Sequence, residues 1–139
     1  MYLTEEEIAI YEQEVLLKED KDILMEMSNL RKSDTGLDEN IWLYDDGCYR
    51  NVKHNVPRIK FQNDNSDRIN KSNLIPISIS DTPQILKKNV SLNIDSKELN
   101  RLKEFIILNK EALLKHWNNE ISFLQFGQLM KRVDNKKSS

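Results

Sequence analysis

Pro57-Arg58-Ile59-Lys60-Phe61 is the stretch that decides the fold, because basic and apolar side chains alternate along it. A period of two is the pattern of a β-strand, in which successive side chains point to opposite faces. Ile59 and Phe61 then lie on one face, against a core, and Arg58 and Lys60 lie on the other. The sequence therefore predicts a half-buried strand whose outer face is cationic.

Further strands are predicted on both sides of this one. Residues 41–44, Ile-Trp-Leu-Tyr, end at an Asp-Asp-Gly turn signal that can close a strand. Isoleucines alternate over residues 75–79, where Pro76 lacks an amide hydrogen and favours the edge of a sheet. Val, Leu and Ile alternate again over residues 90–94. Together these segments predict a small antiparallel sheet of three to four strands.

The N-terminal region, residues 1–32, is predicted to be an acidic helical arm. Thr4 and Glu7 have the spacing of a capping box, in which each side chain accepts a hydrogen bond from a backbone amide at the start of a helix. Apolar residues continue near helical spacing as far as Leu30, but residues 18–22 are all charged. The arm is therefore expected to be a helix pair or one bent helix.

Two more helices are predicted after the strands. Residues 96–118 begin at an Asp-x-x-Glu capping box and carry an apolar stripe at helical spacing, which predicts one long helix. Residues 119–133 are predicted to hold a short amphipathic helix, and residues 134–139 a disordered tail. The length of the chain fits a single domain. The predicted fold is therefore α+β, with residues 40–118 as its core.

Charge is distributed unevenly along the chain, although the net charge is only −2. Residues 1–39 hold 12 acidic and 4 basic side chains, whereas residues 40–139 hold 11 acidic and 17 basic ones. Cys48 is the single cysteine, which excludes an internal disulfide. The apolar run 105–108 is far too short to span a bilayer, and the acidic first twenty residues do not resemble a leader. We therefore expect a cytoplasmic protein without membrane contact.

Patterns typical of catalysis and of metal binding are missing from the sequence. The three glycines never share a loop, which excludes a P-loop or a Rossmann turn. Cys48 with His54 or His116 offers a nucleophile and a base, but no CxxC or HxxxH pair is present to define a metal site. We expect no catalytic residue, no metal and no cofactor.

The candidate binding surface is aromatic and cationic. Its residues are Trp42, Tyr44, Tyr49, Arg50, Lys53, His54, Arg58 and Lys60. Basic side chains bind phosphates and aromatic rings stack on bases, so the surface suits a nucleic acid. Trp, Tyr and Arg are also the preferred anchors of protein interfaces, so it suits a protein partner. In a third interpretation, Trp42 and Tyr44 belong to the core, and the basic side chains only keep the outer face of the strand hydrated.

Two segments carry a family resemblance. Residues 54–60, His-Asn-Val-Pro-Arg-Ile-Lys, resemble an H-N-P-P-H-F-H segment, and residues 109–117 resemble an H-x-E-L-L-x-N-W helix end. These two motifs are found in a family of small bacterial and phage domains of unknown function, which are encoded near toxin–antitoxin genes and in prophages. The resemblance covers residues 40–118. Arg58 and Lys60 replace two family histidines, which argues against a histidine cluster as a metal or acid–base site. The resemblance implies an α+β fold and a mobile-element setting, and it implies no activity.

The sequence favours a non-catalytic interaction protein of a phage or other mobile element, which binds and inhibits a host defence or toxin-type protein. The alternative is a nucleic-acid-binding regulator or a toxin–antitoxin component that uses the basic strand face. A third hypothesis is a hydrolytic toxin with His54 as its acid–base group. The sequence leaves open whether the protein forms a homo-oligomer and whether the acidic arm packs on the core.

Overall fold

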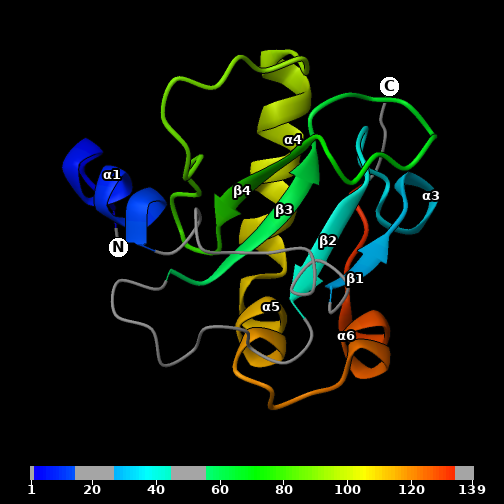
Figure 1. Cartoon of the computed structure of the whole chain (residues 1–139). Helices are drawn as coiled ribbons and strands as arrows, with labels where there is room; N and C mark the ends of the chain where they lie inside the picture. The colour runs from blue at the N-terminus through cyan, green and yellow to red at the C-terminus, as the bar shows by residue number, and fades with distance from the viewer. Residues whose placement is uncertain (1, 15–26, 45–55, 134–139) are drawn as a thin grey trace.

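The computed structural model describes residues 2–14, 27–44 and 56–133, and its α+β fold confirms the predicted class (Figure 1). Within these ranges an antiparallel sheet has four strands in the order β1-β2-β3-β4. The strands are β1 (Met27–Leu30), β2 (Ile41–Tyr44), β3 (Arg58–Gln62) and β4 (Leu74–Ser78). Each strand pairs with its neighbour in the sequence, so β4 with Pro76 lies at one end of the strand order, as predicted.

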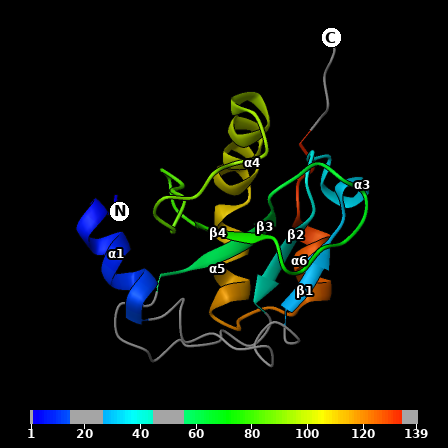
Figure 2. The same ribbon diagram turned by 45° about the horizontal axis from the view of Figure 1, so that its top comes forward.

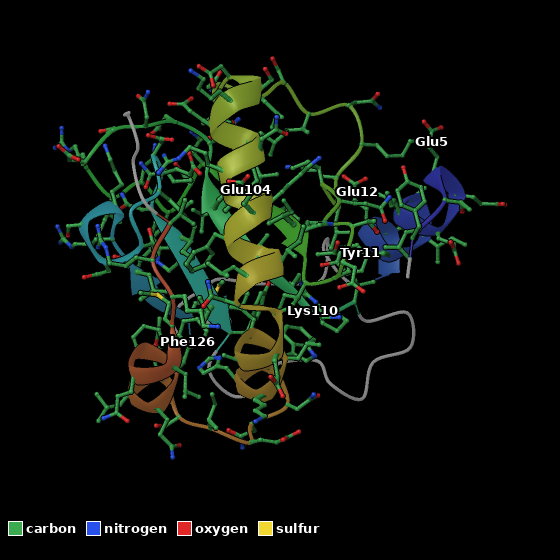
Figure 3. All side chains as sticks on the ribbon, turned by 180° about the vertical axis from the view of Figure 1, so that it is seen from behind. Glu5, Tyr11, Glu12, Glu104, Lys110 and Phe126 are labelled. Carbon is green, nitrogen blue, oxygen red and sulfur yellow. The ribbon has the colours of Figure 1, made fainter. Side chains whose placement is uncertain are left out.

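The helices lie mainly on one side of this sheet. They are α1 (Glu5–Glu14), α3 (Lys32–Thr35), α4 (Ser96–Leu108), α5 (Lys110–Trp117) and α6 (Phe123–Leu129). In Figures 1 and 2, α4 and α5 cross one face of the sheet, α6 lies beside α5, and α1 lies beyond the β4 edge. Figure 3 shows this helical side in front. No helix in the described ranges has the length and apolar character needed to cross a membrane.

The apolar face of β3 contributes to the core, as its alternation predicts. Ile59 pairs with Ile77 across β3 and β4, and both are buried. Phe61 pairs with Ile75 in the same way. The helix α4 adds buried side chains three and four positions apart, Leu102, Phe105 and Ile106, to the same cluster. The apolar residues that alternate along β3 and those at helical spacing along α4 thus pack together in one core between the sheet and the helix.

Capping boxes open three of the helices. The reciprocal pairs are Thr4 with Glu7 in α1, Asp95 with Glu98 in α4, and Ser122 with Gln125 in α6. In each pair the two side chains accept hydrogen bonds from each other's backbone amides, which otherwise have no partner at a helix start. These local motifs explain why the helices begin where the sequence predicts.

Residues 27–30 are a strand and not the end of the helical arm. Met27 and Leu30 are three positions apart, a spacing that suits a helix, but they pair with Tyr44 and Ile41 of β2. A buried neighbouring strand supplies backbone hydrogen bonds and apolar contacts that no local pattern reports. Within the described residues α1 is the helix of the predicted arm.

Residues 90–94 form no strand, contrary to prediction. The side chain of Asn63 donates a hydrogen bond to the Ser91 carbonyl at 3.0 Å and accepts one from the Asn93 amide at 2.8 Å. The side chain of Asn63 thus forms hydrogen bonds with backbone groups that would pair with a neighbouring strand if residues 90–94 were a strand. The apolar alternation still serves the core, because Ile94 is buried.

The long predicted helix is present in two pieces, α4 and α5, separated by Asn109. The backbone of Asn109 leaves helical geometry, with φ −108° and ψ 17°. Its Nδ2 donates to the Phe105 carbonyl at 2.9 Å and to the Lys131 carbonyl at 3.0 Å, and its Oδ1 accepts from the Lys131 amide at 2.7 Å. Asn109 therefore ties the segment after α6 to the α4–α5 junction.

Candidate functional site

Half of the candidate binding residues lie together on one face of β2 and β3. Trp42 pairs with Lys60 across the two strands. Tyr44 and Arg58 lie beside them, with Arg58 Nε 3.1 Å from the Tyr44 hydroxyl. The remaining candidates lie outside the described residues: Tyr49, Arg50, Lys53 and His54.

The predicted exposure of this strand face is wrong. Arg58 is 0% exposed and Lys60 is 7% exposed. Trp42 and Tyr44 are buried as well, as the core interpretation of these two residues predicts. Alternation along a strand separates its two faces, but it does not say whether the second face is covered. Arg58 and Lys60 therefore neither face solvent nor form a surface that a partner can reach.

The Arg58 guanidinium is buried among aromatic rings. Its Cζ lies 4.5 Å from the ring centroid of Tyr44, 5.2 Å from that of Tyr11 and 5.3 Å from that of Trp117. Its Nη1 donates a hydrogen bond to the Val56 carbonyl at 3.0 Å. Rings placed this way attract a cation through their negative faces. Arg58 thus joins α1, β2 and α5, and it shows that the acidic helix α1 packs on the core.

Groups that suit catalysis are not assembled in the described part of the chain. His116 is buried, and its ring centroid lies 6.0 Å from that of Phe123 and 6.1 Å from that of Phe126. No three His, Cys, Asp or Glu side chains of the described residues converge as metal ligands. Cys48 and His54 lie outside those residues. The packing of His116 against two rings is that of a core residue.

Glu39, two residues before β2, is a buried acid that the sequence patterns did not single out. It is 0% exposed, and among the described residues neither of its carboxylate oxygens has a hydrogen-bond partner. Burial raises the pKa of Glu39 to about 8, and repulsion from Asp38 and Glu98 acts in the same direction. The positive charges of Arg101 and Lys32 oppose this shift. Glutamate is rarely fully buried, so no pattern in the sequence marked this position in advance.

Arg101, whose positive charge acts on this acid, is already paired with other groups. Arg101 Nη1 forms an ion pair with Asp38 at 2.5 Å, and its Nη2 donates to the Gly36 carbonyl at 2.6 Å. With its carboxyl protonated at neutral pH, Glu39 avoids the cost of a buried unpaired charge. Glu39 belongs to the stability of the fold, and no hollow described below is lined by it.

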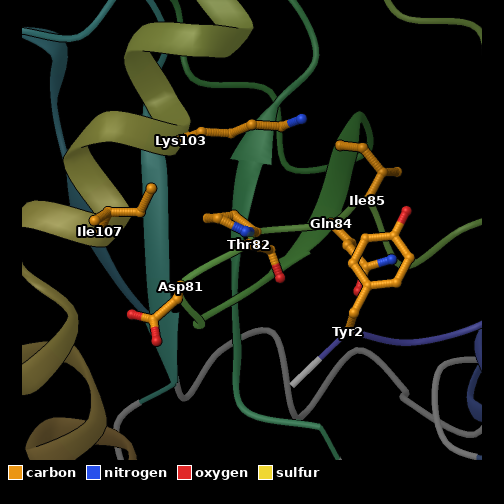
Figure 4. A pocket seen from close by; sticks show the side chains of 8 residues that line it. Tyr2, Asp81, Thr82, Gln84, Ile85, Lys103 and Ile107 are labelled. Carbon is orange, nitrogen blue, oxygen red and sulfur yellow. The ribbon is translucent and has the colours of Figure 1, made fainter.

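A hollow of about 510 Å³ opens beside α4, between this helix, the loop after β4 and the N-terminal segment (Figure 4). Its lining residues are Tyr2, Asp81, Thr82, Pro83, Gln84, Ile85, Lys103 and Ile107. Tyr2 and Ile107 are among the exposed large apolar side chains of the protein. Lys110 forms an ion pair with Asp81 at 2.9 Å and holds the pKa of that carboxyl below its ordinary value.

A second hollow of about 230 Å³ lies between the α4–α5 junction and the end of α6. It is lined by Leu108, Asn109, Glu111, Ala112, Lys115, Leu129 and Lys131. Leu108 is 48% exposed and Leu129 is 52% exposed. The helical side thus carries both hollows, and at each of them large apolar side chains face solvent.

Comparison of the chain with protein-family models, with curated proteins and with solved structures finds no match. The resemblance to small bacterial and phage domains therefore stays a prediction from the sequence. Function has to be inferred from the surface that the fold presents. In the described residues the hollows with exposed apolar side chains lie beside the helices, whereas Arg58 and Lys60 of β3 are buried.

Proposed function

We propose that this protein is a non-catalytic interaction domain that binds a partner protein through its helical side. The observation that carries the proposal is the exposure of Leu108 and Leu129 on the rim of one hollow, with Ile107 exposed in the neighbouring hollow. Large apolar side chains gathered around concave surface are typical of protein interfaces. The buried strand face contributes to this function only through stability.

The partner in this proposal is a host defence or toxin-type protein, and binding of this protein inhibits it. Support for this finer role comes from the sequence resemblance over residues 40–118 and from the mobile-element setting that it implies. The alternative role, nucleic-acid binding through the basic strand face, requires Arg58 and Lys60 to reach phosphates. Both are buried, so the observations favour a protein partner.

The proposal is tested by affinity purification of the tagged protein from its native host, followed by identification of the captured proteins. The double substitution Leu108→Ser and Leu129→Ser is expected to reduce capture of the partner at least tenfold, because apolar anchors dominate interface energy. Both side chains are about half exposed, so the substitutions leave the core intact. Circular dichroism and thermal unfolding check this.

Leu124→Ser is the matched control, because Leu124 is a leucine of the same helix α6, is 74% exposed and does not line the hollow. This control is expected to capture the partner as well as the unmodified protein does. Equal capture by the double variant and the unmodified protein contradicts the proposed surface.

A further inference from the structure

The 510 Å³ hollow has apolar walls on two sides. Ile107 lies on the α4 side, and Tyr2 and Ile85 lie on the opposite side (Figure 4). Tyr2 and Ile107 are both exposed, so their apolar surface is in contact with water. A ligand side chain placed between them removes apolar surface from water on both sides. The geometry favours an apolar or aromatic group.

The charges on the wall are unequal. Asp81 is neutralised by Lys110, whose Nζ lies 2.9 Å away. Lys103 extends from α4 along one side of the hollow, and within the described residues no carboxylate lies within 4.0 Å of its Nζ. The uncompensated charge of the wall is therefore positive. A ligand that brings a carboxylate to Lys103 meets a complementary charge.

The rim of the hollow is held in place before any ligand binds. Gln84 Oε1 accepts a hydrogen bond from the Leu3 amide at 2.7 Å, and its Nε2 donates to the Leu3 carbonyl at 2.9 Å. The backbone of Gln84 is bound to β4 through Ser78, whose amide donates to the Gln84 carbonyl at 2.9 Å. Ordering costs on binding are small for walls arranged in this way.

We infer that this hollow binds a peptide segment of the partner protein that presents an apolar side chain next to a carboxylate. The apolar side chain lies between Ile107 and Tyr2, and the carboxylate pairs with Lys103. The inference rests on the proposed function and names the chemistry of its partner. A nucleic acid fits less well, because it needs several cations in a row and Lys103 is the one basic side chain among the described residues that line this hollow.

The experiment selects heptapeptides from a displayed random library on the purified full-length protein. Enriched peptides are expected to combine an acidic residue with a neighbouring aromatic or large aliphatic one. Fluorescence anisotropy with the most enriched peptide then gives its dissociation constant. Lys103→Glu and Ile107→Ser are each expected to weaken binding at least tenfold. Lys97→Glu, an exposed lysine of the same helix outside the hollow, is expected to change it less than twofold.

A double-mutant cycle tests the ion pair itself. Replacing the acidic residue of the peptide by its amide is expected to weaken binding to the unmodified protein severalfold and to leave binding to Lys103→Gln unchanged. Independent effects of the two changes overturn the assignment of the carboxylate to Lys103. No enrichment, or enrichment of basic peptides, overturns the peptide pocket. Tighter, Lys103-dependent binding of a labelled twelve-nucleotide single strand overturns it in favour of nucleic acid.

The outcome is distinguishable from failure of the proposed function. The variant with Leu108→Ser and Leu129→Ser leaves this hollow unchanged and is expected to bind the selected peptide normally. If the selected peptide binds but the substitutions of Leu108 and Leu129 do not change partner capture, the result contradicts the proposed surface and supports the pocket. Partner capture that depends on the leucines, without peptide selection at Lys103, contradicts the pocket alone.

Discussion

Arg58 illustrates how a basic residue becomes part of a core. Its guanidinium is surrounded by three aromatic rings, and its nitrogens donate hydrogen bonds to Tyr44 and to the Val56 carbonyl. A planar guanidinium is less strongly hydrated than an ammonium and stacks on rings, so arginine is the basic residue that tolerates such a site best. The side chain therefore binds elements of this chain together instead of a partner.

Arg58→Ala is predicted to lower the free energy of unfolding by roughly 3 kcal/mol, because it leaves a cavity and removes hydrogen bonds of a buried charged group. Urea unfolding followed by tryptophan fluorescence measures the change, since Trp117 contacts Arg58 directly. Lys71→Ala, at an exposed position, is the control and is expected to change stability by less than about 0.5 kcal/mol. A loss below about 1 kcal/mol for Arg58→Ala contradicts the packing role.

At the scale of elements, Asn109 organises the smaller hollow on which the proposed function depends. It interrupts the predicted long helix, and its amide group binds both backbone groups of Lys131. Lys131 and Leu129 line the smaller hollow, so this hollow exists only while the segment after α6 stays attached. A buried side-chain amide thus shapes a surface.

Asn109→Ala is predicted to release that segment and to destabilise the protein by about 2 kcal/mol, because the Lys131 amide loses its acceptor and a buried polar contact is removed. Hydrogen exchange of the Lys131 amide is the direct measurement, and it is expected to accelerate at least tenfold. Asn100→Ala, an exposed asparagine of α4, is expected to leave that amide unchanged. Unchanged exchange in Asn109→Ala means that the anchor lies elsewhere.

At the scale of the whole molecule, Glu39 links stability to pH. The carboxyl has an ordinary pKa of 4.5, which burial raises to about 8 in the folded protein. Below pH 4.5 both states hold the proton, so Glu39 causes no pH dependence there. Between pH 4.5 and about 8 the unfolded chain is ionised while the folded protein keeps its proton, so rising pH favours unfolding.

The free energy of unfolding is therefore predicted to fall by up to about 1.4 kcal/mol per pH unit across this window and to level off above it. Glu39→Gln removes the titrating group and is predicted to flatten the profile, with the gain in stability growing up to about pH 8 and staying constant above it. Urea unfolding at half-unit pH steps measures both profiles. Glu104→Gln, at an exposed position of α4, is the control that should keep the original slope. Equal slopes for Glu39→Gln and the unmodified protein refute the linkage.

Local chemistry was sufficient to predict several parts of this protein. The capping pairs, the turn signal after β2, the alternation of β3 and β4 and the apolar stripe of α4 act between residues close in sequence, so the α+β class and most helix starts follow from the chain. The same patterns failed at residues 27–30 and 90–94, where distant partners decide. A neighbouring strand pairs with the first segment, and the Asn63 side chain binds the second.

The candidate site could be read only in part from the sequence, for the same reason. Alternation placed Arg58 and Lys60 on one strand face, and the pairing of β2 with β3 brings Trp42 and Tyr44 to the same face. Whether this face meets water is decided by tertiary packing, in which Tyr11 and Trp117 approach Arg58 from elements far away in the sequence. The sequence alone determined which residues of one strand share a face, because that depends on backbone geometry within the strand. The tertiary structure alone decided which face is a surface, because burial depends on every element packed against it.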